Sequence, residues 1–222
     1  MDKNGLLHLI TRINTQEEGI ADSRETVRWK ALREAETLTD PELFPLLQEI
    51  VQENKGKAKA KRDVRMAAGF IYGRLMEQAF DPESCAFYLR WLEAETNQQM
   101  LCSMLDRISD WQRRAGRMIP AGVDITPILT LAKDGRSHVR HSAIHALRTC
   151  PGRESREVLK FYLTQEDEKV YQYEMYYANI AMQSIGEPED IPLLERFLKS
   201  RRPDLKITAQ YAIQYIRERE LS

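Results

Sequence analysis

The sequence predicts an all-α protein built from tandem pairs of helices, on three observations. One apolar pattern recurs about six times along the 222 residues, and a second apolar pattern recurs between its copies. No run alternates apolar and polar residues between turn signals, so no strand is predicted. The copies follow one another at roughly 31 to 38 residues, a period typical of two-helix repeats. A two-helix unit cannot bury its apolar face alone, so we expect the units to stack into one continuous solenoid.

The first pattern predicts the second helix of each pair. Its clearest copies begin at Val64, Val139 and Leu205. Less exact copies begin at Val27, Leu101 and Glu174. In the clearest copies the fourth, seventh and eighth positions after the start are apolar, which places them on one face of a helix. The fourth position is the small residue Ala68, Ala143 or Ala209. We expect these alanines to let neighbouring pairs pack closely.

The second pattern predicts the first helix of each pair, because its apolar residues are spaced by three and four. It comprises Leu47, Ile50 and Val51; Tyr88, Leu89 and Leu92; Leu159, Tyr162 and Leu163; and Leu194, Phe197 and Leu198. Proline between acidic residues marks helix starts at Pro41, Pro82 and Pro188. Gly73, Gly152 and Gly186 indicate helix ends, since glycine accepts the left-handed conformation beyond a last turn.

Composition excludes several functional classes. Thirty-three basic residues balance 34 acidic ones, giving a net charge of -1, so no long-range field attracts nucleic acid or anionic lipid. No apolar run approaches the roughly 18 residues of a membrane span. The N-terminal apolar positions fit an amphipathic helix rather than a signal peptide. Cys85, Cys102 and Cys150 show no CxxC pairing, which predicts neither a disulfide framework nor a zinc site and favours the cytoplasm.

Three segments then resemble the second helix of HEAT repeats. They are Asp63-Val64-Arg65 with Ala68, Ser137 to Leu147, and Asp204-Leu205-Lys206 with Ala209 and Ala212. The resemblance implies a right-handed α-α superhelix of about six pairs, with N-terminal capping helices over 1–25 and one repeat domain over 26–222. It also implies that Asp63, Arg65, Arg140 and Asp204 join successive repeats. The third repeat, residues 98–124, departs from the pattern, because Arg107 interrupts it and an irregular stretch with Pro120 follows.

The resemblance further implies that the second and sixth positions after each start line a concave groove. Apart from Ser103, these positions hold Trp29, Arg33, Met66, Phe70, Arg107, His141, His145, Tyr176, Ile180, Ile207 and Tyr211. Seven of the twelve are aromatic or large and apolar, which is typical of a surface that binds a protein or peptide. The alternative is that the neighbouring repeat buries some of them. The tyrosines near residue 174, Tyr171, Tyr173, Tyr176 and Tyr177, suit either role.

Other clusters offer weaker signals. His138, His141 and His145 share one helix, and the last two have a spacing that can chelate a metal. HEAT-type iron hydroxylases use His-Glu dipeptides, and this chain has none, so we predict no metal and no cofactor. A predicted inter-helix loop, from Lys55 to Arg62, contains several cationic side chains. These could bind phosphate groups or could simply be exposed to solvent. Arg113, Arg114 and Arg117 form a second basic group.

An enzymatic alternative comes from the same resemblance, because some alkylpurine DNA glycosylases are built from HEAT-like repeats. That family places an aspartate one helical turn after a tryptophan, whereas Trp29, Trp91 and Trp111 precede Arg33, Glu95 and Ala115 at that spacing. Asp106 and Asp110 near Trp111 are the nearest match. A chaperone for a bound pigment is a third possibility, by analogy of fold alone. The sequence favours a non-enzymatic scaffold with a protein or peptide partner, and it specifies neither that partner nor the oligomeric state.

Overall fold

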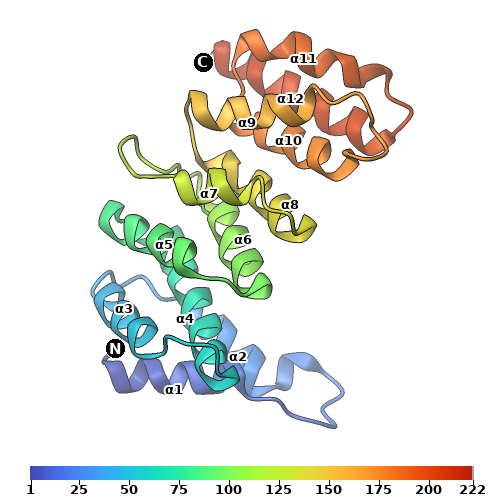
Figure 1. Cartoon of the computed structure of the whole chain (residues 1–222). Coiled ribbons are helices and arrows are strands. Elements are labelled where there is room, and N and C mark those ends of the chain that lie inside the picture. The colour runs from blue at the N-terminus through green and yellow to red at the C-terminus, as the bar shows by residue number, and fades with distance from the viewer. Residues whose placement is uncertain (222) are drawn as a thin grey trace. The chain divides into compact units, whose positions relative to one another are not determined.

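A computed structural model describes residues 1–221, and helices are the regular secondary structure of this part of the chain (Figure 1). Its α-helices follow one another in six consecutive pairs. They are α1 (Lys3–Asn14), α2 (Val27–Ala35), α3 (Leu43–Glu53), α4 (Lys59–Gln78), α5 (Pro82–Ala94), α6 (Gln98–Ala115), α7 (Thr126–Leu131), α8 (Ser137–Ala146), α9 (Arg153–Leu163), α10 (Gln172–Ile185), α11 (Ile191–Glu195) and α12 (Pro203–Glu220). Short 3-10 turns lie at Ser23–Glu25, Leu147–Thr149, Pro188–Asp190 and Arg196–Lys199. The all-α prediction is confirmed.

The chain divides into two compact units. The first unit is Met1–Tyr88 and the second begins at Leu89, so the division falls inside α5. In the first unit α1 packs on α2 and α4, and α3 packs on α4. The apolar face of α1, with Leu6, Leu9 and Ile10, is buried. Asp2 caps this helix by accepting a hydrogen bond from the Gly5 amide at 2.8 Å.

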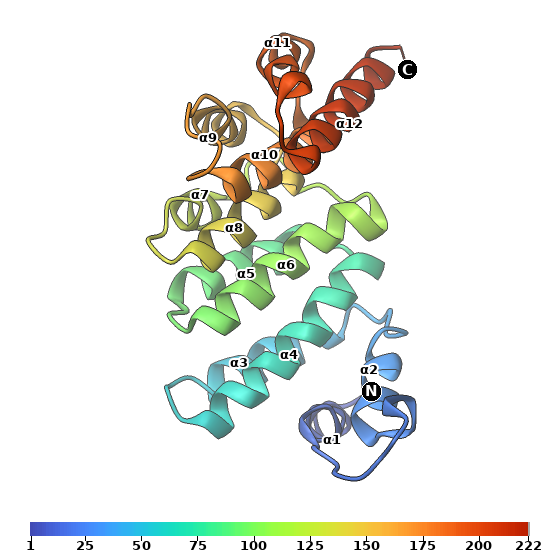
Figure 2. The same ribbon diagram turned by 90° about the vertical axis from the view of Figure 1, so that its right-hand side faces the viewer.

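In the second unit the second helices of the pairs lie next to one another. Helix α8 packs between α6 and α10, and α10 packs on α12, while α7, α9 and α11 contact α8, α10 and α12 (Figure 2). Alanines fill the helix contacts, and Ala143 and Ala209 are fully buried, as is Ala68 in the first unit. The predicted role of these small residues in close packing is therefore supported. No helix among the described residues is both long and apolar enough to cross a membrane.

Hydrogen bonds between neighbouring pairs involve several of the residues expected to join them. Arg140 of α8 bonds to Glu174 of α10, and Asp204 of α12 accepts a hydrogen bond from Gln172 of α10 at 2.9 Å. The main-chain carbonyl of Asp63 accepts a hydrogen bond from the side chain of Asn14, at the end of α1, at 3.1 Å. Arg65 and Asp63 also make bonds inside their own pair. Arg65 donates to the carbonyls of Asn54 and Gly56, which precede its helix, and Asp63 pairs with Lys59 one turn earlier.

Several local predictions were wrong. Gly73 ends no helix, because α4 continues to Gln78 with Tyr72 and Leu75 fully buried on either side of it. Packing of these neighbours outweighs the weak helix propensity of glycine. Gly152 has a positive φ but precedes α9 rather than ending α8. Gly186 does end α10 as predicted, although its backbone is extended rather than left-handed.

The structure also places the basic run from Lys55 and the irregular third repeat. The basic run from Lys55 is a loop only in part, since Lys59 to Arg62 form the first turn of α4. In the third repeat α6 is regular up to Ala115, where Gly116 takes the left-handed conformation at φ 64° and ends it. The irregular stretch predicted after it follows as a turn-containing connection to α7.

Candidate functional site

The eleven residues predicted to line a groove are divided between the two units, and all of them keep part of their surface open to solvent. Trp29, Arg33, Met66 and Phe70 belong to the first unit, on α2 and α4. The others belong to α6, α8, α10 and α12 of the second unit. They are Arg107, His141, His145, Tyr176, Ile180, Ile207 and Tyr211.

In the first unit guanidinium groups cover the aromatic rings. The Arg33 guanidinium lies 5.5 Å from the centre of the Trp29 ring, and that of Arg74 lies 5.4 Å from the centre of the Phe70 ring. Arg33 also pairs with Glu36 at 2.6 Å. These contacts are cation–π interactions, which hold the rings in place while leaving them accessible. Trp29 is 36% exposed, and Met66 and Phe70 are half-buried.

In the second unit the histidines of α8 contact the tyrosines of α10. The His141 ring lies 5.5 Å from the Tyr173 ring and 5.8 Å from the Tyr177 ring, centre to centre. The His145 ring lies 5.4 Å from the Tyr177 ring, and the Tyr176 ring meets that of Tyr177 edge-on. Tyr173 is 59% exposed and its ring is the most open of the group. Two neighbouring second helices thus present one aromatic surface.

Both histidines have lowered pKa values. Burial lowers the pKa of His141, although Glu174 lies 3.2 Å from its Nε2 atom and opposes the shift. Burial, with the charges of Arg148 and Arg113, lowers the pKa of His145 to about 4. Both rings are therefore neutral at pH 7 and can donate and accept hydrogen bonds. Within residues 1–221 no group of three His, Cys, Asp or Glu side chains is placed to hold a metal ion.

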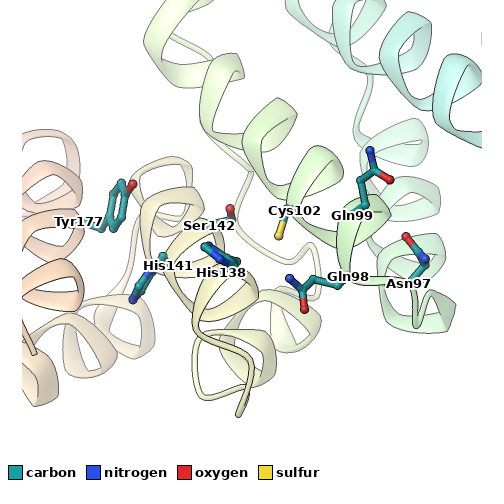
Figure 3. A pocket seen from close by; sticks show the side chains of 8 residues that line it. All are labelled: Asn97, Gln98, Gln99, Cys102, His138, His141, Ser142 and Tyr177. Atoms are coloured by element: carbon teal, nitrogen blue, oxygen red, sulfur yellow. The ribbon is translucent and has the colours of Figure 1, made fainter. Parts of the chain in front are cut away.

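A cavity of about 540 Å³ opens beside these histidines (Figure 3). Side chains of α6, α8 and α10 line it, together with Asn97, the N-cap of α6. Cys102 and Gln98 point from α6 toward α8, from which His138 and His141 project. The lining is rich in polar groups, namely carboxamides, imidazoles and hydroxyls. Carboxamides carry both a donor and an acceptor and so match the main chain of a peptide.

Sequence reasoning missed most of this lining. Ser142 stands at the third position after the pattern start Val139, and Tyr177, already named among the tyrosines near residue 174, stands at the third position after the pattern start Glu174. On a helix of 3.6 residues per turn, the third position lies on the same side as the sixth. That spacing could have identified Ser142 as well. Asn97, Gln98 and Gln99 precede the repeated pattern and had no such signal.

The last helix exposes a row of large side chains. Ile207, Tyr211 and Tyr215 of α12 are spaced by four residues and are 49%, 51% and 46% exposed. Tyr215 was not predicted. The row continues the open side of α10 onto α12, whose opposite side, with Ala209 and Ala212, is buried.

The residues of the glycosylase alternative are placed in a way that argues against it. Trp111 is fully buried and offers no ring surface to a base. Asp110 is buried and pairs with Arg107 at 3.1 Å and with Arg113 at 2.6 Å. Its carboxylate is committed to these ion pairs. Asp106 is exposed and shares a hydrogen bond with Ser142.

Solved structures of three proteins are similar to this chain to different degrees, and the first of them supports the fold. The structure of an engineered protein superposes with a TM-score of 0.52 at 16% identity, covering 98% of this chain and all of that one. A designed armadillo repeat protein gives 0.49 at 15% identity, over 95% and 99% of the two chains. Human deoxyhypusine hydroxylase, in complex with glycerol, gives 0.31 at 13% identity over 97% of each. No family model and no curated protein matches the sequence. The chain has the fold of a helical-repeat solenoid.

Proposed function

We propose that this protein is a non-enzymatic scaffold that binds a protein or peptide partner on the open side of its second helices. The observation that carries the proposal is the exposure of Tyr173, Ile207 and Tyr211, which are about half exposed on neighbouring helices of the second unit. Burying such side chains against a partner removes apolar area from water at about 25 cal/mol per Å². Gathered exposed groups of this kind are typical of binding surfaces.

Polar residues on the same side supply orientation. His141 and His145 are neutral and sit among tyrosines, and the carboxamides of Gln98 and Gln99 reach the cavity beside them. Hydrogen bonds from such groups select the geometry of a partner more than they add affinity. Trp29 with Arg33 offers a smaller surface of the same chemistry in the first unit.

The three cysteines are free thiols, and we assign the protein to the cytoplasm on that ground.

A displayed library of random ten-residue peptides, selected on the purified protein, tests the proposal. We expect Tyr211→Ala to reduce binding of the selected peptides at least fivefold, with helicity and melting temperature unchanged. Phe161→Ala is the matched control. Phe161 is 54% exposed, but it lies on α9, which is the first helix of its pair, whereas the proposed binding side is on the second helices. The proposal fails if no peptide is selected, or if the Phe161 variant loses binding as much as the Tyr211 variant does.

A further inference from the structure

Arg148 is a half-buried arginine without a carboxylate partner. It lies in the 3-10 turn that follows α8, and no ion pair joins it to an acidic side chain among residues 1–221. Its Nη1 atom is 3.4 Å from Nε2 of His145, and its Nη2 atom is 3.5 Å from Oγ of Ser184. Both distances are at the upper limit for hydrogen bonds. Its Nε atom is buried and has no acceptor. A charged group in this state lacks the compensation that buried charges ordinarily have.

The surroundings of Arg148 do not supply the missing negative charge. Burial lowers the pKa of Arg148, and the positive charge of Arg113 lowers it further, while Asp110 opposes the shift. Asp110 is already paired with Arg107 and Arg113, and His145 is neutral at pH 7. The Arg113 side chain is 54% exposed, so a ligand can reach its guanidinium group from solvent. Two guanidinium groups therefore share one neighbourhood that has an excess of positive charge.

We propose that the open side of α6, α8 and α10 binds an acidic peptide and places a carboxylate between Arg148 and Arg113. This inference rests on the proposed function and names the chemistry of the partner. Arginine binds a carboxylate through two parallel N–H groups, and charge-assisted hydrogen bonds of this kind are strong. The carboxylate of the peptide would accept hydrogen bonds from Arg148, which Ser184 and His145 accept only weakly.

The rest of the same side suits a peptide chain. From His138 at the cavity to Arg148 is ten residues along α8 and the 3-10 turn that follows it, about 15 Å at 1.5 Å per residue. An extended peptide covers that distance with about five residues at 3.3 Å each. Its main chain would meet the carboxamides of the cavity, and its side chains would meet the Tyr177 ring, which lines the cavity and contacts His145, the neighbour of Arg148.

A nucleic acid suits this surface less well. A polynucleotide carries a charge at every residue, and Asp106 stands on α6 between the cavity residue Cys102 and Arg113. The net charge of the chain is -1, so no general field attracts a polyanion. One localised anion flanked by aromatic and neutral polar groups fits better than a row of phosphates.

The test begins with the peptides selected from the random library. We expect them to be enriched in Asp and Glu, and each acidic peptide, labelled with fluorescein, is compared with its Asn or Gln copy by fluorescence anisotropy. The acidic peptides should bind wild type at least tenfold more tightly than their neutral copies do. Arg148→Gln should remove that difference. Arg153→Gln, at an exposed position of α9, removes the same charge elsewhere and should keep affinities within twofold of wild type.

Arg113→Gln provides a second variant, because its exposed side chain can be replaced even if Arg148→Gln lowers stability. We expect it to weaken acidic peptides at least threefold. Selected peptides that lack acidic residues, or that bind both variants as they bind wild type, overturn this inference and leave peptide binding intact. A library that yields no binder overturns the proposed function as well. A fluorescein-labelled single-stranded oligonucleotide that binds more tightly than any peptide, and loses binding with Arg148→Gln, assigns the arginines to nucleic acid instead.

Discussion

Arg140 of α8 donates hydrogen bonds from both Nε and Nη2 to the same carboxylate oxygen of Glu174 in α10, at 2.8 and 2.7 Å. The Glu174 side chain is only 4% exposed. Burial by itself raises its pKa, but the hydrogen bonds from Arg140 and the neighbouring charges hold the pKa of Glu174 below its ordinary value. Glu174 is therefore charged at neutral pH, and the pair links two successive repeats.

Replacing Arg140 should destabilise the second unit strongly. Arg140→Leu leaves the buried Glu174 without its guanidinium partner, and breaking such a pair costs about 2–4 kcal/mol of unfolding free energy. Glu174→Gln should cost less, since Arg140 is 23% exposed and still bonds to the carbonyl of Asp134. Urea denaturation at pH 7 measures both. Arg217→Leu is the control, because its ion pair with Glu195 is exposed and should contribute under about 1 kcal/mol. Equal losses in all three variants would contradict the assigned role.

Close packing of the second helices predicts a sharp contrast between adjacent residues of α12. Ala209 is fully buried against its neighbours, whereas Gln210 is exposed. Ala209→Leu adds volume to a filled contact and should lower stability by about 1–3 kcal/mol. Gln210→Leu adds a similar side chain in solvent and should change stability by less than about 0.5 kcal/mol. Thermal unfolding followed by circular dichroism compares them. A tolerated leucine at 209 would show that the helices are not held at close distance there.

The fold could be predicted because periodicity is a local property that burial enforces. Ala68, Ala143 and Ala209 repeat at one position of the sequence pattern, and all three are fully buried. Helix ends were less predictable. Gly73 carries the composition signal of a helix end, yet Tyr72 and Leu75 pack into the core and carry α4 past it. That outcome depends on tertiary contacts, which a local signal does not contain.

The candidate site could be predicted only in outline. Spacing identified one exposed side of each second helix, so His141, His145 and Tyr211 were found. Arg148 was missed because its importance comes from what is absent around it, a carboxylate, and that depends on α6 and α10. Trp111 shows the reverse error. The glycosylase resemblance drew attention to it, with Asp106 and Asp110 as the nearest match, but α6 turns it into the core.

The hydroxyl of Tyr162 should contribute measurably to stability. It donates a hydrogen bond of 2.6 Å to the carbonyl of Ala132 at the end of α7, and both groups are buried. Tyr162→Phe leaves that carbonyl without this donor and should lower the unfolding free energy by about 1–2 kcal/mol. Tyr215→Phe, at a position 46% exposed, should have no effect larger than about 0.5 kcal/mol. Chemical denaturation of both variants gives the comparison. Indistinguishable midpoints would mean that the Tyr162 bond adds nothing.

His145 should make the protein less stable as the pH falls. Its ring lies near Ser109, with Oγ at 3.2 Å from Nδ1, and burial with the charges of Arg148 and Arg113 lowers its pKa to about 4. An unfolded chain returns the histidine to a pKa near 6.5. Between pH 6.5 and about 4 the unfolded state therefore binds a proton that the folded state does not, so the unfolding free energy falls with falling pH and this contribution levels off below about 4. The lowered pKa of His141 acts in the same direction.

Urea denaturation at intervals from pH 7 to pH 4.5 measures this dependence, and carboxylates that titrate in the same range make a variant necessary. His145→Gln keeps a donor and an acceptor near Ser109 but cannot take up a proton in this range. The variant should lose about 1–3 kcal/mol less than wild type over the interval, by the 1.36 kcal/mol that corresponds to each unit of pKa. His138→Gln, at an exposed position of the same helix, should follow wild type. Parallel curves for His145→Gln and wild type would show that the His145 ring is protonated as readily in the folded protein as in the unfolded chain, and so that its surroundings do not exclude the charge.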